Sequence, residues 1–224
     1  MTTSNKNTKD MNILNNIKTS AIITSGGNST RFGSNKLLEK IENLTVIETT
    51  ILKFINLADE IIIPCQEDIK NHIINSNIYN EKIKFAPAGQ TRQESVYNGI
   101  LACSNPDIVL IHDGARPFVD RNIIKQTISL TKEKKAVVVG KMAIDTIKEV
   151  KDGKIIKTLD RKNIFQAQTP QAFDFNTIKK IHETYKNNQS FTDDSSMAEA
   201  FGIDVYIIEN NENNIKITTK QDLS

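Results

Sequence analysis

Residues 20–36 read SAIITSGGNSTRFGSNK and set how the rest of the chain is interpreted. An apolar run at 20–24 is followed at once by adjacent glycines and then by Arg31 and Lys36. An unbroken apolar run of this length is typical of a strand that is covered on both faces. Small residues after such a strand let backbone N–H groups approach an anion, and the two cations add full positive charge. The stretch therefore predicts a buried strand that leads into a phosphate-binding loop.

This loop matches neither of two common nucleotide-binding motifs. It lacks the GxxxxGK[ST] pattern, and Gly26, Gly27 and Gly33 have the wrong spacing for the dinucleotide pattern G-x-G-x-x-G. Adjacent glycines followed closely by an arginine and a lysine suit a nucleoside triphosphate better than a dinucleotide. A plain glycine turn without a ligand is the alternative interpretation.

Short apolar runs alternate with longer amphipathic stretches along the whole chain. Further strands are predicted at 60–64, 82–86, 108–112, 136–140 and 205–209. Helices are predicted at 46–57, 68–75, 92–103, 120–131, 176–187 and 193–201. Repeated strand–helix–strand units give right-handed crossovers and a sheet with helices on both sides. The expected fold class is α/β, a Rossmann-like three-layer sandwich with a mostly parallel sheet and a projecting β-hairpin arm.

The arm is predicted from residues 145–160, DTIKEVKDGKIIKTLD, which alternate with period two around Lys-Asp-Gly-Lys. That pattern indicates a hairpin. An isolated two-stranded ribbon is marginal in water, so it needs a surface to pack on. Either the hairpin folds back on its own domain, or it forms an arm, about residues 141–165, that embraces a second subunit.

Length, charge and hydropathy limit the classes of function. The 224 residues fit a single domain at 19–224 after a flexible polar tail at 1–18. With 29 Lys+Arg against 27 Asp+Glu, the net charge of +2 argues against a nucleic-acid partner held by bulk charge. The apolar runs are far shorter than the ~18 residues of a membrane span, and the N-terminus lacks a signal peptide's apolar core. We expect a soluble, cytoplasmic protein whose Cys65 and Cys103 are reduced core thiols.

A second candidate site lies in residues 88–100, AGQTRQESVYNGI. In a parallel sheet the ligand binds beyond the carboxyl ends of the strands, and this segment follows one of them. Gly89 allows a tight turn, and the free N–H groups of the next helix, with the Ser95 hydroxyl, could read the edge of a base. The alternative is simple capping of that helix by Thr91, with Glu94 as its capping-box partner.

A third candidate site is HDGARP, residues 112–117, after the most apolar strand. A carboxylate at this position is well placed to hold Mg²⁺, and we assign that role to Asp113. Arg116 could bind a phosphate with two hydrogen bonds. An ion pair between Asp113 and Arg116 without any chemistry is the alternative. We interpret His112 as a packing or hydrogen-bonding residue, and His182 as solvated on a helix surface.

Three further polar segments support no function when each is taken alone. They are LDRKNIFQAQTPQAF (159–173), TDDSSMAEA (192–200) and NIKITTKQDL (214–223). The second is typical of a helix start, with Thr192 as the expected cap. Lys216 lies in an alternating, strand-like run, where a solvated lysine is the usual explanation.

Taken in order, these segments resemble one enzyme family. SGGNSTRFGSNK, AGQTRQESVYNGI, HDGARPF, DT, LDR, QTPQAF, TDDSS and NIKITTKQDL resemble the 2-C-methyl-D-erythritol 4-phosphate cytidylyltransferases of the non-mevalonate isoprenoid pathway, over about residues 19–223. The resemblance implies that CTP, with Mg²⁺ or another divalent cation, reacts with a sugar-alcohol phosphate to give 4-diphosphocytidyl-2-C-methyl-D-erythritol and pyrophosphate. A ribitol 5-phosphate (pentitol-phosphate) cytidylyltransferase is the alternative within enzymes. A catalytically silent nucleotide-binding protein is the alternative from another class.

The resemblance also implies roles for the residues at matching positions. Catalysis is assigned to the cations Arg31, Lys36 and Lys216, and the metal to Asp113. CTP contacts are assigned to Ser25, Gly26, Gly27, Gly89, Gln90 and Ser95. Acceptor contacts are assigned to Arg116, Thr146, Arg161, Thr169 and Thr192. Family members are homodimers whose β-arm completes the partner's acceptor pocket. Ser29 stands where the family usually has glycine, which restricts φ in the loop.

The expected chemistry follows from charge. An acceptor phosphate that is already anionic needs no general base to attack the α-phosphate of CTP. The difficulty is to bring two anions together, so catalysis should consist of positioning and electrostatic stabilisation.

Overall fold

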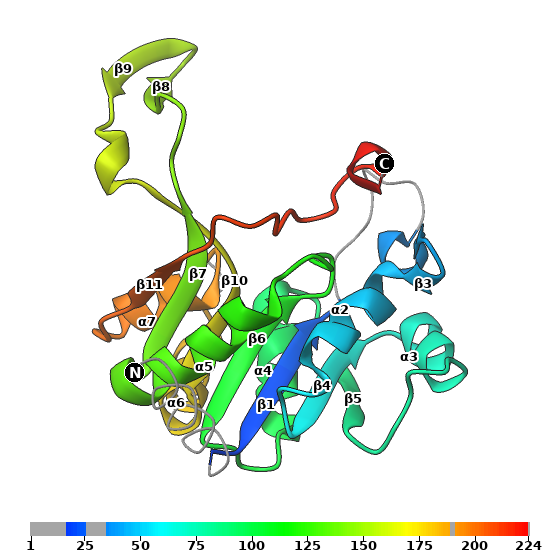
Figure 1. The fold of residues 1–224 in the computed structure, drawn as a ribbon. Coiled ribbons are helices and arrows are strands. Elements are labelled where there is room, and N and C mark those ends of the chain that lie inside the picture. Colours follow the sequence, from blue (N-terminus) through cyan, green and yellow to red (C-terminus); the bar gives the residue numbers. More distant parts are fainter. Residues whose placement is uncertain (1–16, 26–34, 189–190, 224) are drawn as a thin grey trace, which may run out of the picture.

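A sheet of seven strands runs through the centre of the molecule, as seen in the computed structural model, which describes residues 17–25, 35–188 and 191–223 (Figure 1). Its order is β11-β7-β10-β6-β1-β4-β5. The strands are β1 (Thr19–Thr24), β4 (Glu60–Cys65), β5 (Ile83–Pro87), β6 (Ile108–Asp113), β7 (Ala136–Met142), β10 (Phe165–Asp174) and β11 (Tyr206–Glu209). All neighbouring pairs are parallel except those of β10, which runs antiparallel to both β6 and β7.

Helices cover both faces of this sheet and bury a separate apolar cluster on each. One cluster lies under α2 (Val46–Phe54), α3 (Glu67–Ile74) and α5 (Arg121–Lys134). The other lies under α4 (Arg92–Ala102), α6 (Phe175–Tyr185) and α7 (Asp194–Ala200). The central strands are buried along their full length, which is why their sequences read as unbroken apolar runs. The predicted α/β sandwich with a mostly parallel sheet is confirmed.

The remaining elements are short. They are the 3₁₀ turns η1 (Lys36–Leu38), η2 (Arg161–Asn163) and η3 (Lys220–Leu223), and the paired strands β2 (Lys40–Ile41) and β3 (Leu44–Thr45). The segment 214–219 after β11 is extended but belongs to no sheet, so its strand-like alternation is not a strand. Instead the N–H of Ile217 donates to the carbonyl of Ala115 at 2.8 Å, which holds this segment beside the end of β6.

Every predicted strand and helix is present, with ends shifted by at most a few residues, but one strand of the seven-stranded sheet was missed, as was the short pair β2 and β3. β10 lies between β6 and β7, near the middle of the sheet. Its sequence, FQAQTPQAFD, contains three glutamines and Pro170, and the Thr169–Pro170 peptide bond is cis. The pairing of β10 with β7 is irregular between Ala167 and Gln171, next to that proline. A strand interrupted in this way lacks the apolar run by which its neighbours were recognised.

The predicted hairpin is formed by β8 (Lys148–Lys151) and β9 (Lys154–Thr158). Asp152 and Gly153 have φ of 49° and 74°, as a two-residue turn with both central residues left-handed requires. Figure 1 shows the ribbon standing away from the sheet, and all residues of both strands are exposed. The interpretation that the hairpin folds back on its own domain is therefore wrong. Its apolar side chains Val150, Ile155 and Ile156 are 56–64% exposed.

Two further expectations concern apolar segments and thiols. Among the described residues, no helix combines the length and the apolar character that a membrane span requires. Cys65 and Cys103 are both free thiols, and they contact the two different core clusters. Burial raises the pKa of each thiol to about 12; Cys65 is buried, as predicted for a core thiol, and Cys103 is half-buried.

Candidate active site

A polar cleft of about 670 Å³ opens at the carboxyl ends of β1 and β6, where the parallel strands predict a ligand site. It is bounded by the start of α4 on one side and by the extended segment 214–219 on the other. Six residues to which sequence reasoning gave a role line it together: Ser25, Lys36, Gly89, Gln90, Asp113 and Lys216. The cleft thus gathers residues that are widely separated in the sequence.

Asp113, the last residue of β6, is the electrostatic centre of the cleft. Its carboxylate contacts three cations: Lys216 Nζ at 2.9 Å, Arg116 Nε at 3.4 Å and Arg92 Nε at 3.5 Å. Burial alone would raise the pKa of Asp113, but Lys216 and Arg92 outweigh that effect and hold the pKa well below its usual range. Asp113 is therefore ionised at any physiological pH.

Lys216 reaches this carboxylate from the extended segment after β11. Its backbone is fixed because the next residue, Ile217, bonds to Ala115, directly after the Asp113 turn. The side chain remains 40% exposed and faces the cleft. The alternative of a merely solvated lysine is wrong, because Lys216 is paired with a buried carboxylate.

Arg116 ties the same segment to the site. Its Nη1 donates to the carbonyl of Asn214 at 2.7 Å, while its Nε faces Asp113. Asn214 is fully buried and its amide nitrogen donates to the carbonyl of Thr169 at 2.9 Å. The expected ion pair between Asp113 and Arg116 is present. The assignment of Arg116 to the acceptor stays a prediction.

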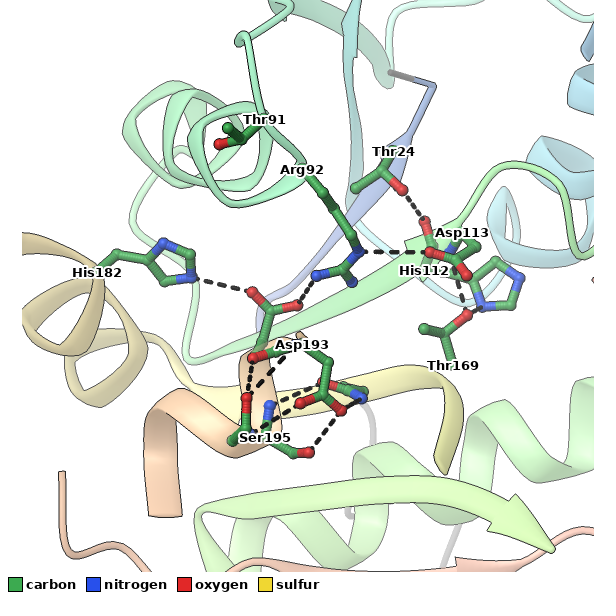
Figure 2. Close-up of polar contacts among 12 residues, drawn as sticks. Thr24, Thr91, Arg92, His112, Asp113, Thr169, His182, Asp193 and Ser195 are labelled. Carbon is green, nitrogen blue, oxygen red and sulfur yellow. Dashed lines mark hydrogen bonds and ion pairs between the residues drawn. The ribbon is translucent and has the colours of Figure 1, made fainter. Parts of the chain in front are cut away.

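His112 and Thr169 form a chain of hydrogen bonds with the backbone of Asp113 (Figure 2). The N–H of Asp113 donates to Thr169 Oγ1 at 3.0 Å, and this hydroxyl lies 3.0 Å from His112 Nδ1. His112 Nε2 lies 3.0 Å from the carbonyl of Arg116, so Nε2 carries the proton and Nδ1 accepts from Thr169. Burial lowers the pKa of His112 to about 4, which keeps the ring neutral at pH 7. The ring also packs on Phe54, as the predicted packing role requires.

The Thr169 hydroxyl is thus used inside the protein. It accepts from Asp113 and donates to His112, and Thr169 is only 4% exposed. In this structure its visible role is to hold the backbone of Asp113. Its assignment to the acceptor stays a prediction.

The loop at Gly89 borders the cleft on the α4 side. A Cβ atom at Gly89 would lie 2.5 Å from Cβ of Glu94 and 2.6 Å from the nitrogen of Ser95, so the close approach requires glycine. The Ser95 hydroxyl accepts the N–H of Gly89 at 2.9 Å and donates to the carbonyl of Thr91. Ser95 is 1% exposed, so it shapes the loop from below, and its contact with a base stays a prediction.

The capping alternative predicted two contacts for this segment, and one of them is present. Thr91 caps α4, because its side chain accepts the N–H of Glu94 at 3.1 Å. The Glu94 carboxylate, however, accepts the N–H of Gln90 at 2.7 Å instead of that of Thr91. Both contacts fix the turn whose backbone faces the cleft.

Sequence reasoning missed a second buried carboxylate next to the cleft. Arg92 Nη1 donates to Asp194 at 2.7 Å, so its guanidinium joins Asp194 to Asp113. Asp194 also accepts from Nε2 of His182 at 3.1 Å. The prediction that His182 is solvated is wrong: the residue is 1% exposed and stacks on Tyr97. The one available signal was the pair of adjacent aspartates in TDDSS.

The start of α7 also differs from expectation. Asp193, and not Thr192, caps this helix, because its carboxylate accepts the N–H of Ser196 at 2.9 Å. Asp193 is held in turn by Gln171 Nε2 at 2.7 Å and by the hydroxyl of Ser195 at 2.7 Å (Figure 2). Thr192 is exposed.

Other predicted site residues lie away from the cleft or outside the described residues. Thr146 and Arg161 are exposed on the arm, where the Arg161 guanidinium donates to the carbonyl of Ile144. Gly26, Gly27, Ser29 and Arg31 belong to the stretch 26–34, outside the described residues.

The residues of the cleft fit a divalent cation in one particular mode. Within the described ranges, no group of three or more His, Cys, Asp or Glu side chains could hold a metal ion. A metal ion in the cleft would therefore be held by at most two such side chains of the described ranges, and Asp113 is the candidate carboxylate. Mg²⁺ is commonly bound in this way, by one or two carboxylates with substrate phosphates and waters as the other ligands.

Comparisons with known proteins agree with one another. The family model described as IspD, 2-C-methyl-D-erythritol 4-phosphate cytidylyltransferase, matches residues 19–224. The chain is 45% identical to the protein of that name from Clostridioides difficile over 217 residues, which are 92% of this chain and 90% of the relative. It is 42% identical to the protein of that name from Clostridium beijerinckii, over 91% and 94% of the two chains.

Solved structures give the same result. The crystal structure of 4-diphosphocytidyl-2C-methyl-D-erythritol synthase from Anaerococcus prevotii has a TM-score of 0.81 at 31% identity, covering 92% of this chain and 95% of the other. The crystal structure of 2-C-methyl-D-erythritol 4-phosphate cytidylyltransferase from Francisella tularensis has a TM-score of 0.79 at 34% identity, covering 92% and 96%.

Proposed function

Since the chain belongs to the 2-C-methyl-D-erythritol 4-phosphate cytidylyltransferase family, we propose that the cleft at Asp113 is where CTP and 2-C-methyl-D-erythritol 4-phosphate react. The chain is thus a nucleotidyltransferase, and neither the ribitol 5-phosphate alternative nor a silent binding protein is favoured. One observation supports this location above all. Lys36, Asp113 and Lys216 line one polar cleft at the carboxyl end of the sheet.

The reaction needs charge stabilisation and no proton acceptor. An oxygen of the acceptor phosphate forms a bond with the α-phosphorus of CTP, while the bond from that phosphorus to the β-phosphate oxygen breaks and pyrophosphate leaves. No proton moves in this step when the acceptor phosphate is a dianion. His112, the histidine nearest to Asp113 in the sequence, is buried and neutral, so it supplies neither a charge nor an exposed base. Lys36 and Lys216 line the cleft together with Arg92, and the two lysines are our candidates for facing the phosphates.

Asp113 is our candidate for the metal ligand. Its carboxylate stays ionised, and it is fixed through its own N–H by Thr169 and through its oxygens by Lys216, Arg116 and Arg92. When bound there together with the triphosphate, Mg²⁺ would neutralise charge on the phosphate oxygens. Asp113→Asn should therefore weaken metal binding and remove most of the activity while the fold persists.

The loop at Gly89 is our candidate for base recognition. Its turn is fixed by three contacts, from the Ser95 hydroxyl, the Glu94 carboxylate and the Thr91 cap. Gly89 and Gln90 therefore present a rigid backbone to the cleft. Ser25 lines the same cleft, and its hydroxyl donates to the carbonyl of Pro64 at 2.6 Å. A rigid polar edge of this kind suits the hydrogen-bonding edge of cytosine.

We further propose a homodimer in which each arm completes the partner's acceptor pocket. The arm exposes Val150, Ile155 and Ile156, and every residue of its two strands is exposed against the described part of the chain. Thr146 and Arg161 lie at that base, away from the cleft of their own chain. Sedimentation equilibrium tests the proposal directly: a monomer at micromolar concentration would contradict it.

The function is tested by pyrophosphate release from CTP with two acceptors. We expect turnover with 2-C-methyl-D-erythritol 4-phosphate and little with ribitol 5-phosphate, and Asp113→Asn should remove the activity. Equal turnover with both acceptors would contradict the assigned acceptor. Full activity in Asp113→Asn would contradict the assigned location.

A further inference from the structure

Arg92 is shared unequally between two buried carboxylates. Its Nη1 lies 2.7 Å from Oδ2 of Asp194, whereas its Nε lies 3.5 Å from Oδ1 of Asp113. Figure 2 shows Arg92 extending from the start of α4 toward Asp113, with His182 on the opposite side of the network. The guanidinium therefore makes its short contact with the carboxylate that lies farther from the cleft.

Asp194 is held firmly in this position. It is fully buried at the start of α7, and His182 Nε2 donates to its second oxygen at 3.1 Å. The preceding residue, Asp193, is fixed by Gln171 and Ser195. Arg92 lowers the pKa of Asp194 to about 2, against the effect of burial, which would raise it. A buried ion pair of this kind contributes little net stability compared with apolar packing, but removal of one partner leaves the other charge buried and uncompensated.

The two oxygens of Asp113 differ in their surroundings. Lys216 and Arg116 both contact Oδ2, at 2.9 and 3.4 Å. Among the residues that the structure describes, Arg92 is the charged group that contacts Oδ1, and it does so at the longest of the three distances. The distance between Arg92 and Oδ1 therefore decides whether this oxygen is open to another cation.

We propose that Asp194 is a positioning residue that draws the Arg92 guanidinium away from Oδ1 of Asp113 and so leaves this oxygen open to a divalent cation. The inference rests on the proposed function, in which Asp113 is the metal ligand. Without the charge of Asp194, Arg92 would close on Asp113 and compete with the metal. A second substitution that removes the charge of Arg92 should then reverse the loss.

The test measures Mn²⁺ binding by the electron paramagnetic resonance signal of the free ion. The full chain is saturated with a non-hydrolysable CTP analogue, and a titration of the analogue alone is subtracted. Wild type is compared with Asp194→Asn, Arg92→Gln and the double variant. Because a charge at 4–6 Å changes a carboxylate's affinity for a proton by about 10- to 1,000-fold, we expect Asp194→Asn to bind Mn²⁺ roughly tenfold more weakly. The double variant should bind close to wild type.

A purely structural role predicts a different pattern. If Asp194 only stabilised α7, the double variant would bind as weakly as Asp194→Asn, and the proposal would be wrong. Unchanged Mn²⁺ affinity in Asp194→Asn would also overturn it. Should Asp194→Asn fail to fold by thermal melting, Arg92→Gln remains decisive, because we expect it to bind Mn²⁺ at least as tightly as wild type, and weaker binding contradicts us.

Asp113→Asn separates this inference from the proposed function. If Asp113→Asn loses Mn²⁺ binding while Asp194→Asn retains it, the metal assignment stands and the role of Asp194 falls. If Asp113→Asn binds Mn²⁺ as wild type does, the metal assignment fails, and the inference about Asp194 fails with it.

Discussion

Two lysine–carboxylate pairs of nearly equal length lie in different regions of the molecule. In the cleft, Lys216 lies 2.9 Å from Asp113, and on the arm, Lys157 lies 3.0 Å from Glu149. The carboxylate of Asp113 is only 10% exposed, whereas that of Glu149 is 50% exposed. An exposed pair is screened by water and contributes about 0–1 kcal/mol to stability. Removing one partner of a buried pair is strongly destabilising, because the other charge stays buried without compensation. The two pairs therefore differ in the burial of the carboxylate and not in the distance between the charged atoms.

The same contrast extends to the regions as wholes. Around the cleft, buried ionised groups hold one another: Asp113 is held by three cations, and Arg92 by two carboxylates. On the arm, the strands bond mainly to each other and expose their apolar side chains. The cleft is organised by contacts within one chain, whereas the strand residues of the arm are exposed among the described residues. Four changes test this comparison, from the largest expected effect to the smallest.

The largest effect is expected from Lys216→Ala. Removing one preorganised group that stabilises developing negative charge costs about 10²–10³ in kcat, and we expect a loss of this size. Steady-state kinetics with circular dichroism would show the loss with the fold intact. Lys220→Ala is the matched control, since Lys220 is an exposed lysine of the same C-terminal segment. Turnover near wild type in Lys216→Ala would remove the cleft pair from catalysis.

The second change concerns His112, a buried residue next to Asp113 in the cleft region. Burial lowers the pKa of His112 from 6.5 to about 4. The unfolded chain therefore binds more protons between these pH values, and the free energy of unfolding falls as the pH drops from 6.5 to 4. A shift of this size corresponds to about 3 kcal/mol. Asp113 and Asp194, whose pKa values are lowered from 3.8, also lose their stabilising contributions as the pH falls, but mainly below pH 4.

Comparison with His112→Gln isolates the histidine. Urea unfolding at pH 7 and at pH 4.5 should show a smaller loss of stability in the variant than in wild type. Equal losses in the two proteins would mean that His112 is not held neutral by burial.

A smaller effect is expected from Arg161→Glu at the base of the arm. If Arg161 binds the acceptor phosphate, losing a charge-assisted contact of about 1.5–3 kcal/mol raises the KM for the acceptor by tenfold or more. The KM for CTP should not change. Lys157→Glu reverses a charge on the same arm and serves as the control. A rise confined to the KM for CTP would place Arg161 elsewhere in the mechanism.

The smallest effect is expected from Glu149→Gln, which breaks the exposed pair. Stability should change by less than about 1 kcal/mol, and kcat should not change. Thermal unfolding and steady-state kinetics measure both. A loss comparable with that of Lys216→Ala would mean that the arm pair is buried in the working protein, which would itself be evidence for a partner.

Sequence patterns predicted most of the fold because the buried strands are short apolar runs. β6, read as IVLIH, is buried throughout, so its hydropathy alone identifies it. β10 was missed because several of its side chains are polar and bond to residues of neighbouring elements. Gln171 bonds to Asp193 and Thr169 bonds to Asp113, so polar residues occupy a strand near the middle of the sheet.

The site was predicted only in part, because some of its residues are far apart in the sequence and belong to no common motif. Lys36, Asp113 and Lys216 were identified from motifs whose order resembles one family, and all three line the cleft. Arg92 and Asp194 are 102 residues apart, and neither periodicity nor composition shows that their side chains meet. His182 lies on an amphipathic helix and was assigned to the wrong face, because its buried partner Asp194 cannot be read from the helix itself.

The antiparallel pairing of β7 with β10 has a consequence for how the arm can change. Met142 at the end of β7 lies opposite Phe165 at the start of β10, so the chain leaves the sheet and returns to it at the same point. Residues 143–164 are therefore an excursion between two adjacent anchor points. Doubling the length of a flexible closed loop costs only about 0.6 kcal/mol, so such an excursion can be lengthened, shortened or exchanged without rebuilding the domain. Under the proposed homodimer, grafting an arm from another protein between these anchors would be a practical way to change which chains assemble.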